Sequence, residues 1–224
     1  MTNILYKKFV PTQITSGVPS KNKSGGQQIP LSYQSMTNYT IQTPVMSLPF
    51  GISEYTPDVG ATKYSLELSF KGADTDPKIA TFKKLIEDLD NHFIDLAVKN
   101  SQEWFGKKMS AEVVSELYRP IMKPSKQPEK YASTMKLKLR ERNEVLEAKA
   151  TTLDGEPFDI SKISPGTTGA AIMDFAPMWF VNKQFGVTLT LLAMSIHTTP
   201  NHTRDFTFEN DDDDDDMTTR SDDE

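Results

Sequence analysis

The chain has 224 residues and a formal net charge of −6 at pH 7. Its length, less a tail and a polar N-terminal stretch, leaves one domain of ordinary size, since domains cluster at roughly 100–150 residues. It has no cysteine, no run near the ~18 apolar residues of a membrane span and no secretion signal, so we expect an intracellular protein in a reducing compartment, without disulfides, metal–thiolate sites or a membrane.

The first third of the chain predicts a loop followed by two strands. Residues 11–35 are rich in Ser, Gly, Gln and Pro and have no periodicity, which predicts a flexible loop. Residues 36–52 are dominated by Thr, Ile, Val and aromatic residues. In residues 63–71, Tyr64, Leu66, Leu68 and Phe70 alternate with polar residues. We expect both stretches to be strands, the second with one buried face.

A long helix is predicted between Pro77 and Phe105. Apolar residues recur there every three or four positions, which places them on one side of a helix: Ile79, Phe82, Ile86, Leu89, Phe93 and Leu96. Asp76 offers an N-cap and Gly106 a C-terminal stop. A shorter helix is expected from Ser110 to Tyr118, before Pro120.

The remainder predicts strands. Met135, Leu137 and Leu139 alternate with Lys136, Lys138 and Arg140, which indicates a strand with one apolar and one cationic face. Residues 145–153 lead into Asp154-Gly155, a pair that favours a hairpin turn. Residues 169–181 and 185–196 predict a core hairpin joined by residues 182–184. Strands, one inserted long helix and more strands favour a β-rich α+β fold, and an OB-fold-like five-stranded antiparallel barrel fits best.

Signals for catalysis are missing. The chain lacks a phosphate-binding GxxxxGK[ST], a GxGxxG, a GxSxG elbow and an HExxH. His92, His197 and His202 form no ligand set, and we expect them to be structural or on the surface. A flexible run of aspartates cannot fix the coordination geometry of a metal. We therefore expect no catalytic residues, no metal site, no cofactor and no enzymatic activity.

Positive charge is concentrated between Tyr118 and Arg142. This basic segment contains eight Lys and Arg residues but only two Glu residues, and Tyr118 and Tyr131 lie among them. Single-stranded nucleic acid is typically held by a basic groove that follows the phosphates and by aromatic rings on which bases stack. The alternative is a solvated edge strand, where lysines prevent aggregation. The segment thus predicts either a nucleic-acid groove or a protected edge.

Trp179 and Phe180 are neighbours in a predicted strand, where adjacent side chains point to opposite faces. One ring could therefore be a stacking platform for a base. In the alternative arrangement both rings are packed, one inside the barrel and one under the long helix. Trp104 and Phe105, at the end of the helix, are expected in the core.

The C-terminal residues carry the opposite charge to the body. Residues 1–204 have a net charge of +4, and residues 205–224 have −10. We expect residues 205–224 to be a disordered acidic tail after a single domain over residues 1–204. A tethered polyanion can occupy a basic groove until nucleic acid displaces it, or it can recruit basic proteins. The remaining alternative is a tail that only keeps the protein soluble.

Three features resemble the single-stranded-DNA-binding proteins of nucleocytoplasmic large DNA viruses, especially algal ones, which are related to the replication protein of T-odd phages. They are PIMKPSKQPEKYASTMKLKL (residues 120–139), WFVNKQFGVTLTLL (residues 179–192) and the acidic tail. The resemblance covers about residues 39–197. It implies an OB-fold, sequence-tolerant binding of single strands, a homodimer, and a tail that contacts the replicative DNA polymerase and gates the groove. Phage members end in an aromatic residue, whereas Phe206 and Phe208 precede the acidic run here.

The sequence therefore predicts a non-enzymatic single-stranded-DNA-binding protein for viral replication, recombination or repair, located in the host nucleus or at a cytoplasmic viral replication site. The expected groove residues are Lys123, Lys126, Lys130, Lys136, Lys138 and Arg140, with Tyr131 and Trp179 as stacking rings. The expected partner-binding tail residues are Phe206, Phe208, Asp211, Asp212, Asp213, Asp214, Asp215 and Asp216. The alternative is an acidic-tailed chaperone or assembly factor for basic proteins.

Overall fold

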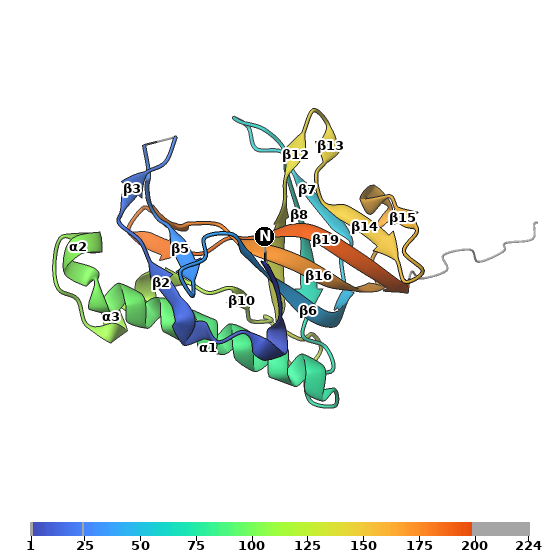
Figure 1. Ribbon diagram of the computed structural model, residues 1–224, viewed down its shortest axis with the longest axis horizontal. Helices are drawn as coiled ribbons and strands as arrows, with labels where there is room; N and C mark the ends of the chain where they lie inside the picture. Colours follow the sequence, from blue (N-terminus) through green and yellow to red (C-terminus); the bar gives the residue numbers. More distant parts are fainter. Residues whose placement is uncertain (1, 24, 199–224) are drawn as a thin grey trace, which may run out of the picture.

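Five strands close into a barrel that forms the body of the fold (Figure 1). The computed structural model describes residues 2–23 and 25–198. The barrel strands are β6 (Tyr39–Leu48), β8 (Lys63–Ser69), β11 (Thr134–Leu139), β16 (Thr167–Phe175) and β19 (Leu189–Thr198). They pair in the order β11-β8-β6-β16-β19, and β19 pairs again with β11. The predicted OB-fold-like barrel is confirmed.

The strand pairing that closes the barrel, its seam, differs from the other four strand pairings. The pairs β11–β8, β8–β6, β6–β16 and β16–β19 are antiparallel, whereas β11 and β19 run parallel, with Leu137 opposite Leu189 and Lys138 opposite Thr190. The predicted barrel was antiparallel throughout. A parallel seam needs a crossover connection, and the long chain between β11 and β19, which includes β16, supplies it.

Alternation of side chains builds the barrel core. Leu66 and Leu68 of β8 and the three apolar residues of β11 are buried, while Lys136 and Lys138 are exposed. Successive side chains of a strand point to opposite faces, so the apolar set fills the barrel and the lysines lie outside. One pattern thus determines both the core and the charge of the outer surface.

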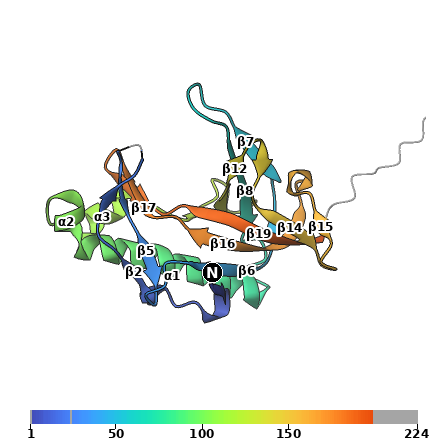
Figure 2. The same cartoon turned by 45° about the horizontal axis from the view of Figure 1, so that its top comes forward.

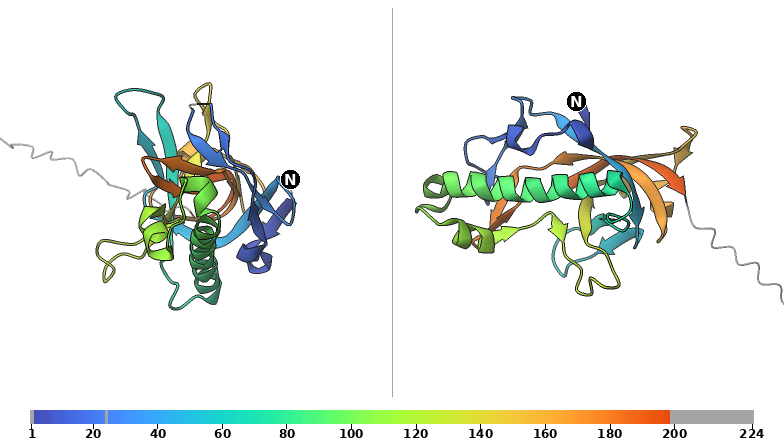
Figure 3. Two further views of the ribbon diagram at one scale, coloured as in Figure 1. Left: turned by 90° about the vertical axis from the view of Figure 1, so that its left-hand side faces the viewer. Right: turned by 90° about the horizontal axis from the view of Figure 1, so that it is seen from below.

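The long helix runs along the lower side of the molecule in Figure 1 and lengthwise across the right-hand view of Figure 3. This helix, α1 (Pro77–Lys99), is capped by Asp76, whose carboxylate accepts a hydrogen bond from the Lys78 backbone N–H at 2.8 Å. Its buried face consists of Ile79, Phe82, Leu85, Ile86, Leu89, Phe93 and Ala97. None of the helices in the described ranges is long and apolar enough to cross a membrane.

The helix predicted between Pro77 and Phe105 ends earlier than expected. α1 stops at Lys99, and a separate α2 (Ser101–Phe105) follows. The break lies at Asn100, whose side-chain N–H donates to the Leu96 carbonyl at 2.8 Å and so caps α1. Gly106 closes α2 in the left-handed conformation, with φ 77°. α3 (Ala111–Leu117) follows Ser110, close to the predicted short helix.

A second sheet stands beside the barrel, on the side of the molecule that carries α2 (Figure 2). Its order is β3 (Ser20–Lys21), β4 (Gln27–Ile29), β17 (Met178–Val181), β18 (Gln184–Gly186) and β9 (Tyr118–Arg119). The predicted hairpin over residues 169–196 therefore contributes to two layers. β16 and β19 pair in the barrel, and β17 and β18 pair in the second sheet across a tight turn at residues 182–183.

The prediction of a flexible loop over residues 11–35 needs correction. This stretch contains β3, β4 and a further antiparallel pair, β2 (Ile14–Ser16) with β5 (Leu31–Tyr33). Four of its apolar side chains are buried, Ile14, Ile29, Leu31 and Tyr33, whereas Val18 is exposed. They are separated by polar residues, so the local composition looked like a loop. Pairing with β17 and burial in the hydrophobic core order the segment instead.

The remaining strands extend the barrel sheet or form small hairpins. β1 (Thr2–Leu5) pairs with β6, β7 (Ile52–Tyr55) with β8, and β10 (Met122–Lys123) with β11. β12 (Glu141–Arg142) pairs with β13 (Val145–Leu146). β14 (Lys149–Thr152) pairs with β15 (Pro157–Phe158) across Asp154-Gly155 at the predicted hairpin. Short 3-10 helices cover Tyr6–Lys8, Pro11–Gln13 and Ile160–Lys162. The predicted tail, with Phe206, Phe208 and the aspartate run, lies outside the described residues.

Candidate nucleic-acid interface

Positive charge gathers around a hollow of about 460 Å³ on the outer face of β8 and β11, which we call the first hollow. Four cationic side chains line it: Lys63, Arg119, Lys136 and Lys138. Among residues 2–23 and 25–198, no carboxylate lines it. Within the described part of the chain, none of the four makes an ion pair. Their charge is therefore available to an anionic ligand.

Strand register explains how these cations meet. Lys138 lies opposite Ser65 of β8, and Lys63 lies opposite Tyr55 of β7. Alternation along β8 places residues 63 and 65 on the same face as the two lysines of β11. Arg119 reaches the hollow from β9 of the second sheet, so three separate parts of the sequence supply its charge.

Trp179 forms an aromatic wall of the first hollow. It pairs with Gly186 of β18, and a Cβ at Gly186 would lie only 2.9 Å from Cζ2 of the indole. The glycine therefore allows the indole to lie against the strand. Phe180 packs on the other side, with ring centroids 5.9 Å from Trp104, 5.5 Å from Phe105 and 5.6 Å from Phe185. Only Phe180 of the pair joins this aromatic cluster.

A smaller hollow of about 310 Å³, the second hollow, lies on the same outer face. Lys123, Lys126 and Tyr131 line it together with Phe50 and Glu67. The Glu67 carboxylate accepts a hydrogen bond from the Thr134 hydroxyl at 2.7 Å and lies 3.7 Å from the Lys123 ammonium nitrogen. The second hollow thus combines two cations, one carboxylate and two aromatic rings.

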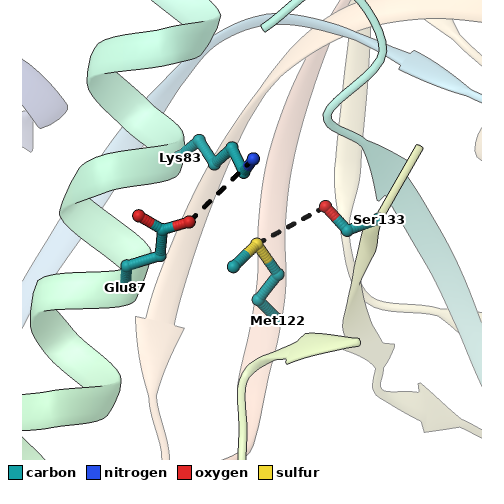
Figure 4. A network of polar contacts seen from close by, with 4 residues as sticks. All are labelled: Lys83, Glu87, Met122 and Ser133. Atoms are coloured by element: carbon teal, nitrogen blue, oxygen red, sulfur yellow. Dashed lines mark hydrogen bonds and ion pairs between the residues drawn. The ribbon is translucent and has the colours of Figure 1, made fainter. Parts of the chain in front are cut away.

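Two of the predicted groove cations lie elsewhere. Lys130 lines a hollow of about 1010 Å³ between α1 and the β10–β11 connection, which we call the helix-side hollow. Figure 4 shows part of its wall, where Lys83 lies 4.0 Å from Glu87 and the Ser133 hydroxyl donates to the Met122 sulfur at 3.5 Å. Three cations and four carboxylates of the described chain line this hollow, so these residues give a polyanion no net attraction.

Arg140 is the second of these cations. Its guanidinium donates to the Asp174 carboxylate of β16 at 3.1 Å. Asp174 lies opposite Thr190 of β19, and Thr190 lies opposite Lys138 of β11, so the ion pair reaches across β19. Of the eight predicted groove residues, Lys136, Lys138 and Trp179 therefore share the first hollow, and Lys123, Lys126 and Tyr131 share the second.

Asp90 of α1 positions the segment that carries Arg119. Its carboxylate accepts hydrogen bonds from the Tyr118 hydroxyl at 2.7 Å and from the Ile121 and Met122 backbone N–H groups at 2.9 and 3.4 Å. Burial raises the pKa of Asp90, and the three hydrogen bonds oppose that rise. Burial, with the adjacent Asp90, also raises the pKa of Tyr118. Tyr118 is thus a buried anchor rather than an exposed ring for a base.

In the described part of the chain, the histidines belong to no metal-binding group of side chains. No group of three or more His, Cys, Asp or Glu side chains there could hold a metal ion. The His92 Nε2 atom lies 2.9 Å from the Ile14 carbonyl oxygen, so this histidine bridges α1 and β2. His197 lies in β19, and His202 lies outside the described residues.

Sequence reasoning missed Tyr55, Lys63 and Phe50, and it counted Arg119 only as part of the basic segment. Lys63 begins the alternating stretch that was predicted to be a strand. It lies two residues before Ser65, so alternation could have placed both side chains on the outer face of the barrel. Tyr55 and Phe50 carried no such signal, because their positions depend on the pairing of β7 with β8 and on the bend between β6 and β7.

Comparison with known proteins gives a family and a fold. Residues 73–210 match a family of unknown function, DUF5871. The chain belongs to this family. No curated protein matches this DUF5871 member. A single-stranded DNA-binding protein from bacteriophage Enc34, solved in complex with ssDNA, is similar to it in structure, with 16% identity and a TM-score of 0.50 over 82% of this chain and 96% of that chain. It shows that this DUF5871 member shares the fold of a phage single-stranded-DNA-binding protein.

A second solved structure is gp2.5, a single-stranded DNA binding protein encoded by bacteriophage T7. It is 15% identical, with a TM-score of 0.49 over 78% of this chain and 100% of that chain. At such identities a structural likeness concerns the fold. What the DUF5871 member binds has to be argued from its own surface.

Proposed function

We propose that this protein binds single-stranded DNA without sequence preference and acts in viral DNA replication, recombination or repair. The observation that carries the proposal is the first hollow, where four cations without ion pairs in the described part of the chain stand beside Trp179 and Tyr55. The OB-like barrel supports it, because the face of the second and third strands and the adjacent loops bind oligonucleotides in OB-folds. In this chain those strands are β8 and β11.

The two kinds of side chain have different tasks. The cations attract phosphates and release their counterions, which gives affinity without reading sequence. The rings of Trp179 and Tyr55 offer apolar faces on which any base can stack. In a duplex both faces of a base are already covered by its neighbours, so this surface favours unpaired strands.

The acidic tail acts as a competitor and a recruiter in this proposal. Residues 205–224 carry a net charge of −10, and a polyanion tethered to the body competes with phosphates for the same cations. DNA that displaces the tail frees it to bind a replicative polymerase or other replication proteins. Dimerisation and a location in the host nucleus or at a cytoplasmic viral replication site belong to the same proposal.

Titration of a labelled unstructured oligonucleotide with the full chain, and with a chain truncated before Asp205, tests this function. We expect binding that weakens linearly in log K against log salt, tighter binding after truncation, and quenching of tryptophan fluorescence as bases approach Trp179. Absence of any salt-sensitive binding in both forms would refute the proposal.

The tail charge also favours a second function, a chaperone or assembly factor for basic proteins. The same truncation separates the two. The chaperone hypothesis predicts that truncation abolishes binding to a basic protein such as a histone. It also predicts no oligonucleotide binding before or after truncation.

A further inference from the structure

We propose that the bound strand continues from the first hollow past Glu67 into the second hollow, where further bases stack on Phe50 and Tyr131. This inference rests on the proposed function and extends it. It divides the binding face into two subsites for bases, each with its own cations, separated by one carboxylate.

The two rings of the second hollow are exposed although they are apolar. The exposed fraction is 58% for Phe50 and 66% for Tyr131. A single exposed aromatic residue is ordinary, but these two line the same hollow, together with Lys123 and Lys126. Apolar faces next to ammonium groups complement a nucleotide, which has a flat base and an anionic phosphate.

The backbone fixes the position of Phe50. Gly51 adopts φ 63°, and a Cβ at this position would lie 2.7 Å from the Ile163 carbonyl oxygen. Only glycine fits this left-handed bend against the chain at Ile163. The bend separates β6 from β7 and leaves the neighbouring Phe50 on the surface. The ring is therefore presented by a packed turn.

Tyr131 is held by a hydrogen-bonded turn. Its backbone N–H donates to the Gln127 carbonyl at 2.9 Å, and the Lys130 N–H donates to the same oxygen at 3.0 Å. The Gln127 N–H in turn donates to the Ser125 hydroxyl at 3.1 Å. Because these bonds order the loop before a ligand arrives, stacking on Tyr131 costs less conformational entropy than stacking on a free loop would.

The two hollows lie next to each other along β11. Lys136 lines the first hollow, and Thr134, two residues earlier on the same face, lines the second. Two residues of a strand span about 7 Å. Lys136 also lies opposite Glu67, which lines the second hollow. A strand that leaves the first hollow along β11 thus enters the second without leaving the face.

Glu67 divides the path. Among the described residues it is the only carboxylate that lines either hollow, and its side chain is 12% exposed. A phosphate above this carboxylate would be repelled, so a base or sugar passes over it. Phosphates contact Lys138, which lies opposite Ser65, before the strand reaches Glu67, and they contact the exposed Lys123 and Lys126 after it. Glu67 thereby fixes where the backbone can lie.

Oligothymidylates of about 4 to about 16 nucleotides, the range of site sizes for OB-folds, test the inference in the full chain. We expect affinity to rise with length in two steps as the hollows fill in turn. The double variant Phe50→Ala/Tyr131→Ala should lose the second step, a loss of roughly 5- to 150-fold for each base stack removed. It should bind the shortest oligonucleotide as the wild type does.

Two controls keep this result interpretable. Leu153→Ala removes a side chain that is 62% exposed and lines neither hollow, and it should change no affinity. Phe50→Tyr/Tyr131→Phe keeps both rings and should keep the second step. Equal thermal unfolding midpoints for all variants would show that the fold is intact.

The outcomes separate this inference from the function on which it rests. Wild-type binding of short oligonucleotides without a second step, or equal losses at every length in the double alanine variant, would overturn the two-subsite path and leave the function standing. No binding at any length would overturn both. Glu67→Gln adds an independent check, because it removes the repulsion and should tighten binding of long oligonucleotides more than short ones. Weaker binding of the long ones would contradict its role as a divider.

Discussion

Neutralising Lys136 and Lys138 together tests the core of the proposed site. Both ammonium groups lie in the first hollow and have no ion pair in the described residues. If each contacts one phosphate, Lys136→Gln/Lys138→Gln should flatten the slope of log K against log salt by about 1.4, since each contact to single-stranded DNA contributes about −0.7. With equal affinities at 1 M salt as the reference, the variant should then bind about 14-fold more weakly than the wild type at 0.15 M salt and about 65-fold more weakly at 0.05 M salt.

Fluorescence anisotropy with a labelled oligothymidylate over a series of salt concentrations measures both numbers. The matched control is Lys78→Gln/Lys84→Gln on α1, which changes the net charge equally but lines neither hollow. It should keep the wild-type slope. If both double variants lowered affinity by the same factor, the protein would be responding to net charge alone, and the placement of DNA on β8 and β11 would be refuted.

Three further predictions concern the elements that support the site. Asp90→Ala should lower the free energy of unfolding by about 3–5 kcal/mol in urea denaturation, because it leaves three partly buried donors unsatisfied. An unchanged denaturation midpoint would contradict the anchoring role of Asp90. Burial raises the pKa of Asp90 above 3.8. The stability that this raised pKa contributes is complete below pH 3.8 and decreases as the pH rises through the raised pKa. Between those two pH values, wild type should therefore lose stability relative to Asp90→Asn. Gly51→Ala should cost about 2–4 kcal/mol, more than the ~1 kcal/mol expected for Gly155→Ala, since both have positive φ but only Gly51 has a close neighbour; equal losses in thermal unfolding would refute the contact argument.

The barrel and the long helix could be predicted because their signals are local. The apolar residues of α1 follow the helical period, and those of β8 and β11 alternate. The second sheet could not be predicted, because β3 and β4 are only two and three residues long. β3 pairs with β4, and β4 pairs with β17, about 150 residues later. No window of sequence contains that pairing, so residues 11–35 resembled a loop.

Lys136 and Lys138 were predicted as groove residues, but Lys63 was missed and the arrangement of the cations was not predicted. Counting charge in the basic segment treats all eight cations alike, whereas the fold gives Lys136 and Lys138 to the first hollow and pairs Arg140 with Asp174. The residues that make this distinction, Asp174 and Glu67, lie on other strands. The role of a charged residue in one strand can therefore be inferred only when the register with the neighbouring strands is known.

Register also links stability to binding in this protein. A slip of β11 by one residue would turn Lys136 and Lys138 into the core and expose Leu137, at the cost of burying two unpaired ammonium groups. The apolar residues of β11 thus hold the lysines on the outer face without any contact from the lysines themselves. Replacing an exposed lysine by glutamine leaves that apolar set untouched, so it should alter binding while changing the free energy of unfolding by no more than about 0.5 kcal/mol. A loss of DNA affinity in such a variant can therefore be assigned to the outer face rather than to the core.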